Sequence, residues 1–173
     1  MGASYSRKGS GLKSLEAALD RIRKSEVLVG IPAEKASRRG DAINNPSLLF
    51  IHTKGSELNN LPARPVLEPS IEKNKAIIAS HLGEAARNLI AKKPQEALRE
   101  LNLAGDSAAS GAKQYFVEPN PWPPDKPETI ARKARKHSGG RKGKAEPFIN
   151  QTLIDFGRMR NAISWLVRTD DGR

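Results

Sequence analysis

The sequence contains no cysteine, few aromatic residues and no long hydrophobic run. Without cysteine the chain has neither a disulfide framework nor a cysteine-based zinc site, so its fold must be held by packing alone. Aromatic residues make up only 5% of the chain, which predicts a thin core of leucine, isoleucine, valine and alanine that partners complete. No segment approaches the roughly 20 apolar residues that span a bilayer, and residues 1–11 lack the apolar run of a cleaved signal. We therefore expect no membrane partner.

Positive charge, in contrast, is abundant. The chain has 30 lysines and arginines against 19 aspartates and glutamates, for a formal net charge of +11. Such a charge attracts phosphate polymers, anionic membranes and acidic protein surfaces, so we expect the partner to be an anion. A length of 173 residues suffices for one domain, because domain cores usually need about 100 to 150 residues. We predict a single domain over residues 12–168, with flexible ends at residues 1–11 and 169–173.

Four segments are predicted in the N-terminal third of the chain. Leucine and isoleucine recur at steps of three and four over residues 12–24, which predicts an amphipathic helix. Residues 26–31 are rich in valine and leucine and are followed by a proline, which predicts a strand. Residues 33–44 are polar and charged, so we expect a mobile loop. Asn45 is the predicted N-cap of a short helix over residues 47–54.

Two longer helices are predicted in the middle of the chain. Residues 61–65 are stiffened by two prolines and lead into a helical period that continues over residues 67–93. A proline follows, so we expect a break or an antiparallel return near residues 93–95 and then a second helix. Gly105 and Gly111 should weaken this second helix by about 1 kcal/mol each relative to alanine.

The sequence changes character at residue 119, where a proline-rich and basic arm begins that extends to residue 147. The arm has too few apolar residues to fold alone, so we expect an extended segment with at most one helical turn. Apolar and polar residues then alternate over residues 161–168, as in a strand with one buried face. Together these elements predict an α+β fold, in which a small β-sheet packs against one long and several shorter helices and extended basic loops project from them.

No motif predicts catalysis, a cofactor or a metal site. Asp155, Phe156 and Gly157 match the metal-binding triplet of protein kinases, but the sequence has neither the glycine-rich loop nor the catalytic loop of those enzymes. Gly143 and Lys144 resemble the end of a phosphate-binding loop whose other residues are missing. The three histidines stand in separate segments, without carboxylates at metal-ligand spacing. We therefore expect a protein that is not an enzyme and works by binding.

The arm carries the densest positive charge of the chain. Seven cations fall within thirteen positions, on the C-terminal side of Trp122: Arg132, Lys133, Arg135, Lys136, Arg141, Lys142 and Lys144. Such a run is either a solvated surface or a contact with nucleic-acid phosphates or an acidic partner. No signature of a sequence-reading module accompanies it, so binding to DNA would not depend on base sequence. Non-specific nucleic-acid binding is therefore one hypothesis for the function.

A second hypothesis rests on short motifs that follow one another in a fixed order. They are Val29-Gly30-Ile31-Pro32, Ile51-His52-Thr53-Lys54-Gly55, Leu61-Pro62-Ala63-Arg64-Pro65, Pro121-Trp122-Pro123-Pro124 and the run Leu-Ile-Asp-Phe-Gly-Arg-Met-Arg-Asn-Ala-Ile at residues 153–163. The chain resembles, over about residues 12–168, the tail-completion or virion-morphogenesis proteins of long-tailed bacteriophages. It differs at Thr53 and Lys54, where the family has an acidic and an aromatic residue, and at Phe156, where the family has threonine.

The resemblance implies an α+β subunit of the neck, where the head and the tail of the phage meet. It implies a homo-oligomeric ring around the DNA channel, a hexamer by the symmetry of that family. The implied neighbours are other neck and tail proteins, such as the tail terminator or head-closure proteins, and packaged double-stranded DNA. The implied location is the virion, with assembly in the host cytoplasm.

Five residues of these motifs are candidate structural or inter-subunit contacts: Arg64, Trp122, Asp155, Arg158 and Arg160. Pro62 and Pro65 fix the backbone on both sides of Arg64. They would hold its side chain out for an inter-subunit salt bridge or for a turn-stabilising bond to a carbonyl. Asp155 would cap a short turn and place both later arginines on one side of it. The alternative is that these residues only fix local turns.

Overall fold

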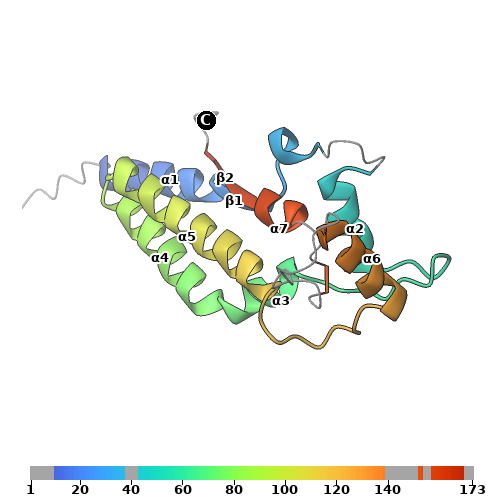
Figure 1. The fold of residues 1–173 in the computed structure, drawn as a ribbon. Coiled ribbons are helices and arrows are strands. Elements are labelled where there is room, and N and C mark those ends of the chain that lie inside the picture. The colour runs from blue at the N-terminus through green and yellow to red at the C-terminus, as the bar shows by residue number, and fades with distance from the viewer. Residues whose placement is uncertain (1–9, 38–42, 139–151, 154–156, 170–173) are drawn as a thin grey trace, which may run out of the picture.

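The computed structural model describes residues 10–37, 43–138, 152–153 and 157–169. Within these ranges the chain forms seven α-helices, one short 3₁₀ helix and a two-stranded antiparallel sheet, which confirms the predicted α+β fold. Two long helices lie side by side beneath the sheet, and most of the shorter helices gather at one end of the molecule (Figure 1). None of the described helices combines the length and the apolar character that crossing a bilayer requires.

Helix α1 (Ser10–Arg23) confirms the amphipathic helix that the leucine spacing predicted. It contacts helix α4 (Lys75–Ile90) of the central pair. Ala18 is the buried residue of its described part, whereas Leu12, Leu15 and Leu19 stay exposed. The apolar stripe of α1 is therefore only partly covered by its own chain.

The sheet is formed by the two strands that the sequence predicted. Strand β1 (Glu26–Gly30) pairs antiparallel with β2 (Ser164–Arg168), which joins residues from near the two ends of the chain. One face of the sheet packs on helix α5 (Pro94–Tyr115). Trp165 and Val167 lie on this inner face, in agreement with the predicted alternation.

The C-terminal strand is shorter than the prediction. Residues 161 and 162 belong to the short helix α7 (Arg158–Ala162), and the strand assignment for residues 161–163 was wrong. Gly157 precedes the helix with a left-handed φ of 68°, a conformation that glycine adopts at little cost. Met159 and Ala162 are buried, so the helix is stabilised by packing that local alternation of side chains does not reveal.

One continuous helix over residues 67–93 was predicted, and this is also wrong. Two helices, α3 (Leu67–Lys73) and α4, are separated at Asn74, where φ is −100° and ψ is 10°. The Asn74 amide Nδ2 donates a hydrogen bond to the Ser70 carbonyl at 2.8 Å. The same amide lies against Gly111 of α5, where a Cβ would stand 2.5 Å from it. The break therefore depends on a glycine in another helix.

The antiparallel return after α4 is confirmed. Lys92 adopts a left-handed φ of 59°, and Pro94 then starts α5, which packs along α4 (Figure 1). Eight of the fifteen buried apolar residues among those described are alanine. Small side chains let the helices approach closely, which gives the thin core that the low aromatic content predicted.

The largest buried apolar side chains gather at the C-terminal end of α5. Phe116, Val66 and Ile163 are almost fully buried, and Leu49 and Met159 join the same cluster. These residues come from segments far apart in the sequence, so this cluster fixes how the short helices sit on the central pair.

Helix α2 (Asn45–Lys54) is confirmed, but its N-cap lies one residue earlier than predicted. The side chain of Asn44 accepts a hydrogen bond from the Ser47 backbone N–H at 2.8 Å. Asn45 is instead buried, and its Nδ2 donates to the Lys35 carbonyl at 2.9 Å. Asn45 therefore joins the helix to the segment before it.

Both predicted loops contain helix. In the loop at residues 33–44, Ala33–Lys35 form the 3₁₀ helix η1, and residues 38–42 lie outside the described part of the chain. In the arm, residues 119–126 form neither helix nor strand, and helix α6 (Pro127–Ser138) then follows with twelve residues, where a single turn was expected. Residues 139–147 lie outside the described part. Within the arm, Lys133 of helix α6 donates a hydrogen bond to Asp125 of the preceding segment at 2.7 Å.

Candidate functional site

The proline-stiffened segment before α3 turns Arg64 into the protein. Its backbone N–H donates to the His52 carbonyl at 2.6 Å, and only 6% of the residue is exposed. The guanidinium Nη2 donates to the carbonyls of Pro123 and Pro124, at 2.9 and 3.2 Å. Arg64 is therefore not held out from the surface. Of the two contacts that the sequence suggested, the bond to a carbonyl is present, and it ties this segment to the start of the arm.

A second contact of Arg64 leads to Asp125, which lies between two cations. The Asp125 carboxylate is 3.5 Å from Arg64 Nη2 and accepts a hydrogen bond from Lys133 Nζ at 2.7 Å. The three side chains are only 7%, 7% and 8% exposed. Two buried cations thus share one carboxylate, which offsets part of the cost of holding positive charge away from water. We refer to Arg64, Asp125 and Lys133 as the charge triad.

Trp122 fastens the arm beside the charge triad. Its indole Nε1 donates to the Pro65 carbonyl at 3.1 Å. The ring makes edge-to-face contacts with Tyr115 and Phe116, with centroid distances of 5.5 and 6.2 Å. The backbone N–H of Trp122 also donates to the side chain of Asn120 at 3.3 Å. The described start of the arm is therefore fixed to the end of α5 and is not a free extension.

The two arginines of α7 lie in different surroundings. Arg158 is exposed and lines a cleft to which α6 and the charge triad also contribute. Arg160 donates through Nε to the Lys113 carbonyl of α5 at 2.9 Å. Residues two apart on a helix do not share a face, so the expectation that both arginines lie on one side was wrong. The proposed cap, Asp155, lies outside the described residues, and Gly157 occupies the N-cap position.

The basic cluster of the arm is split by the fold. Arg132 and Arg135 are exposed on α6, whereas Lys133 between them is buried in the charge triad. The side chain of Lys136 and the whole of Arg141, Lys142 and Lys144 lie outside the described part. Lys133 therefore does not form a surface with its neighbours, although the sequence placed it with them.

These elements enclose a cleft of about 910 Å³. Its walls are residues 48 and 52 of α2 with the loop at residues 56–62, the proline segment before α6, one face of α6, and the start of α7. The described residues that line it carry five cationic and two anionic side chains, a net charge of +3: Arg64, Lys126, Arg132, Lys133 and Arg158, with Glu57 and Asp125. Its apolar lining comes from Leu48, Leu61, Pro62, Pro123, Pro124, Leu153 and Met159.

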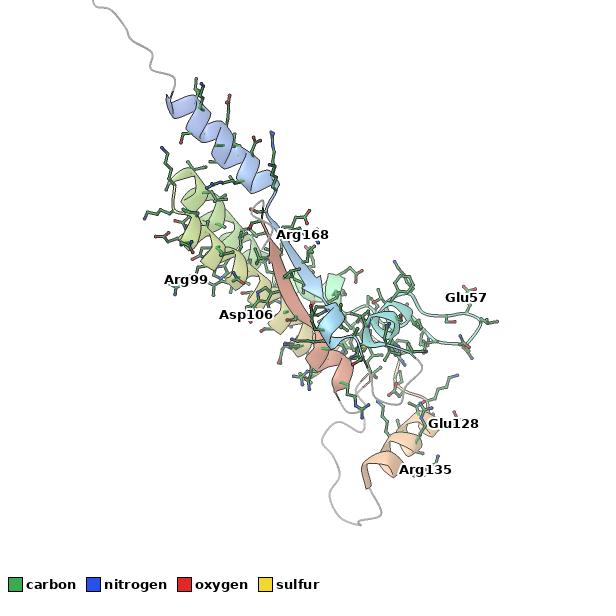
Figure 2. The ribbon with its side chains drawn as sticks, turned by 90° about the horizontal axis from the view of Figure 1, so that it is seen from above. Glu57, Arg99, Asp106, Glu128, Arg135 and Arg168 are labelled. Atoms are coloured by element: carbon green, nitrogen blue, oxygen red, sulfur yellow. The ribbon has the colours of Figure 1, made fainter. Side chains whose placement is uncertain are left out.

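The cleft lies at the end of the molecule opposite α1. Figure 2 shows the loop that carries Glu57 and the helix that carries Glu128 and Arg135 at this end. Asp125, Lys126 and the loop at residues 56–62 were not predicted to belong to a site. Asp125 lies eight residues before Lys133, but its second partner, Arg64, comes from a distant segment. No local sequence pattern could therefore predict the charge triad.

The described residues contain no group of three or more histidine, aspartate or glutamate side chains that could hold a metal ion. Away from the cleft, His81 Nδ1 lies 2.7 Å from Glu100 Oε2, a contact that joins α4 to α5. A structural link between two helices explains this pair.

Comparisons of the chain with protein-family models, with curated proteins and with solved structures found no match. The fold and the site define an α+β protein with a cationic, partly apolar cleft at one end and exposed apolar faces at the other.

Proposed function

We propose that this protein is a structural subunit of a bacteriophage neck, which acts in tail completion or head-tail joining by assembling into a ring with copies of itself. The proposal starts from the family resemblance of the motifs over residues 12–168. Four of these motifs, at residues 51–55, 61–65, 121–124 and 153–163, contribute to the walls of one cleft. Their convergence supports the resemblance, because residues that share one place in the fold can share one function.

The observation that carries the assembly proposal is the outer face of the sheet. Leu28 and Leu166 stand directly opposite each other in the register and remain 42% and 53% exposed. On the same face, Arg168 Nη1 is paired with Glu26 Oε2 at 3.3 Å. Neither strand has a second partner strand within the described residues. An exposed apolar pair on the outer face of a two-stranded sheet is the kind of surface that a neighbouring subunit covers.

The exposed stripe of α1 supports the same proposal. Leu12, Leu15 and Leu19 present apolar surface on a helix that its own chain covers only in part. A thin, alanine-rich core leaves little further apolar area to bury within one chain, so assembly is the remaining way to remove these side chains from water.

The test is the oligomeric state of the purified full-length protein, measured by sedimentation velocity and native mass spectrometry. We expect a closed ring of six copies of the 18.9 kDa chain, which Leu28→Lys with Leu166→Lys reduces to monomers. Leu58→Lys is the matched control, because Leu58 is 96% exposed and lies in a loop outside the sheet. A monomer at every salt and protein concentration, or equal loss of the ring in the control, would contradict the proposal. So would the absence of the protein from purified particles.

Non-specific nucleic-acid binding is the second candidate, and the exposure of Arg132 and Arg135 on α6 favours it. Each phosphate contact that is lost should reduce the slope of log affinity against log salt by about one. If this helix contacts DNA, replacing both arginines with glutamine should therefore lower the affinity for DNA and reduce the dependence of that affinity on salt concentration. Unchanged binding would remove α6 from the DNA contact.

A further inference from the structure

The cleft beside the charge triad combines three features that together describe a ligand. It has an excess of positive charge, an apolar lining and walls that are fixed to the core. We propose that the cleft binds an acidic peptide segment of another protein in extended conformation, with carboxylates on its cationic side and apolar side chains on its lining. This goes beyond ring assembly and does not depend on it.

The charge of the cleft is available to a ligand. Within the charge triad, Arg64 and Lys133 share the Asp125 carboxylate. The side chains of Lys126 and Arg132 are exposed on the same cleft and form no ion pair with any described residue. Glu57, which also lines the cleft, offsets only part of this charge. Carboxylates are the complementary groups, and pairing with them gives both orientation and specificity.

The lining of the cleft selects a peptide over a nucleic acid. Leucine, proline and methionine side chains face the space, and the described lining includes no phenylalanine, tyrosine or tryptophan. Proteins that bind single strands stack the bases on aromatic rings, and a phosphate backbone has no apolar groups to cover such a lining. An extended peptide does, because its successive side chains point to opposite sides, so alternating acidic and apolar residues meet both walls.

The size and the rigidity of the cleft suit a short segment. Its volume of about 910 Å³ lies near the upper end of the roughly 300–1,000 Å³ of ligand pockets. One wall is held by the bonds from Arg64 to the carbonyls of Pro123 and Pro124, and by the bond from Trp122 to Pro65. A peptide would therefore enter a preformed site, which lowers the entropy lost on binding.

The test uses fluorescence anisotropy with the full-length protein and a fluorescein-labelled peptide of about ten residues that alternates leucine and glutamate. We expect saturable binding that weakens about tenfold or more when Lys126→Glu and Arg132→Glu are combined. The matched control combines Lys13→Glu with Arg99→Glu, which changes the net charge equally at exposed positions away from the cleft. Circular dichroism checks that both variants remain folded.

Two further probes decide between charge alone and the proposed site. A labelled peptide with serine in place of each leucine keeps all carboxylates and should bind about tenfold or more weakly. A labelled single-stranded oligonucleotide should bind without a difference between the cleft variant and the control. The proposal is overturned if both charge variants weaken peptide binding equally, if the serine peptide binds as well as the leucine peptide, or if the oligonucleotide is the ligand that responds to Lys126 and Arg132.

Discussion

The indole of Trp165 lies directly on Gly105, so that a Cβ added to the glycine would stand 2.3 Å from Cδ1 of the ring. Gly105 of α5 is therefore a point of close contact with Trp165 of β2, where an added Cβ would clash with the ring. The sequence suggested that this glycine only weakens its helix. Because Gly105 has no side chain, the sheet can instead pack closely against α5.

Gly105→Ala should destabilise the protein. The methyl group cannot fit unless the tryptophan moves, and overpacking of this kind costs about 1–3 kcal/mol. Gly83→Ala in α4 is the matched control, because its Cβ would meet only the end of the Arg87 side chain at 3.9 Å. The control should stabilise the helix by about 0.5–1 kcal/mol. Urea unfolding followed by circular dichroism measures both, and changes of the same sign would contradict the close contact.

Asp125→Asn should be among the most destabilising single changes on the surface of the cleft. It leaves Arg64 and Lys133 buried without their shared carboxylate, and breaking one partner of a buried ion pair costs about 3–5 kcal/mol. Asp20→Asn on α1 removes an exposed carboxylate 3.9 Å from Arg23 and should cost less than about 1 kcal/mol. The free energies of unfolding of the two variants, compared at the same pH, test this. Similar small losses would show that water reaches the charge triad.

Two substitutions of Trp122 separate its hydrogen bond from its ring. Trp122→Phe removes the bond to the Pro65 carbonyl and should cost about 0.5–1.5 kcal/mol, whereas Trp122→Ala also removes the ring from Tyr115 and Phe116 and should cost about 3–5 kcal/mol. Thermal or urea unfolding gives both values. If the two variants lose equal stability, the ring contributes nothing and the arm is held by the hydrogen bond alone.

Asn44→Ala should cost about 1 kcal/mol, because the side chain that accepts the Ser47 N–H is the N-cap of α2. Asn44→Asp keeps an acceptor at the same place and should retain nearly all of the stability. Urea unfolding of the pair checks the assignment of the cap. An Asn44→Ala variant as stable as the Asn44→Asp variant would mean that the cap seen here contributes little.

The parts of the fold that local periodicity controls could be predicted. The leucine spacing gave helix α1, the valine-rich run gave β1, and the alternation around Trp165 gave the inner face of β2. Each of these signals repeats within a few residues, so the sequence alone contains it. The break at Asn74 could not be predicted, because the apolar period continues through it and the cause lies on the opposite helix.

The candidate site divides in the same way. From the sequence we predicted a dense basic cluster, a stiffened arginine and a tryptophan in the arm, and all of these lie in or beside the cleft where the structure describes them. Which charges face solvent could not be predicted. Lys133 and Arg132 are neighbours in the chain, yet one is buried against Asp125 and the other is exposed.

The sequence by itself determined the fold class, the thinness of the core and the excess of positive charge, because composition and short-range periodicity are properties of the chain before it folds. Only the tertiary structure decided where that charge is buried and where it is available. Arg64 and Asp125 come together only after folding, and their pairing fixes Lys133 inside and leaves Lys126 and Arg132 at the opening of the cleft.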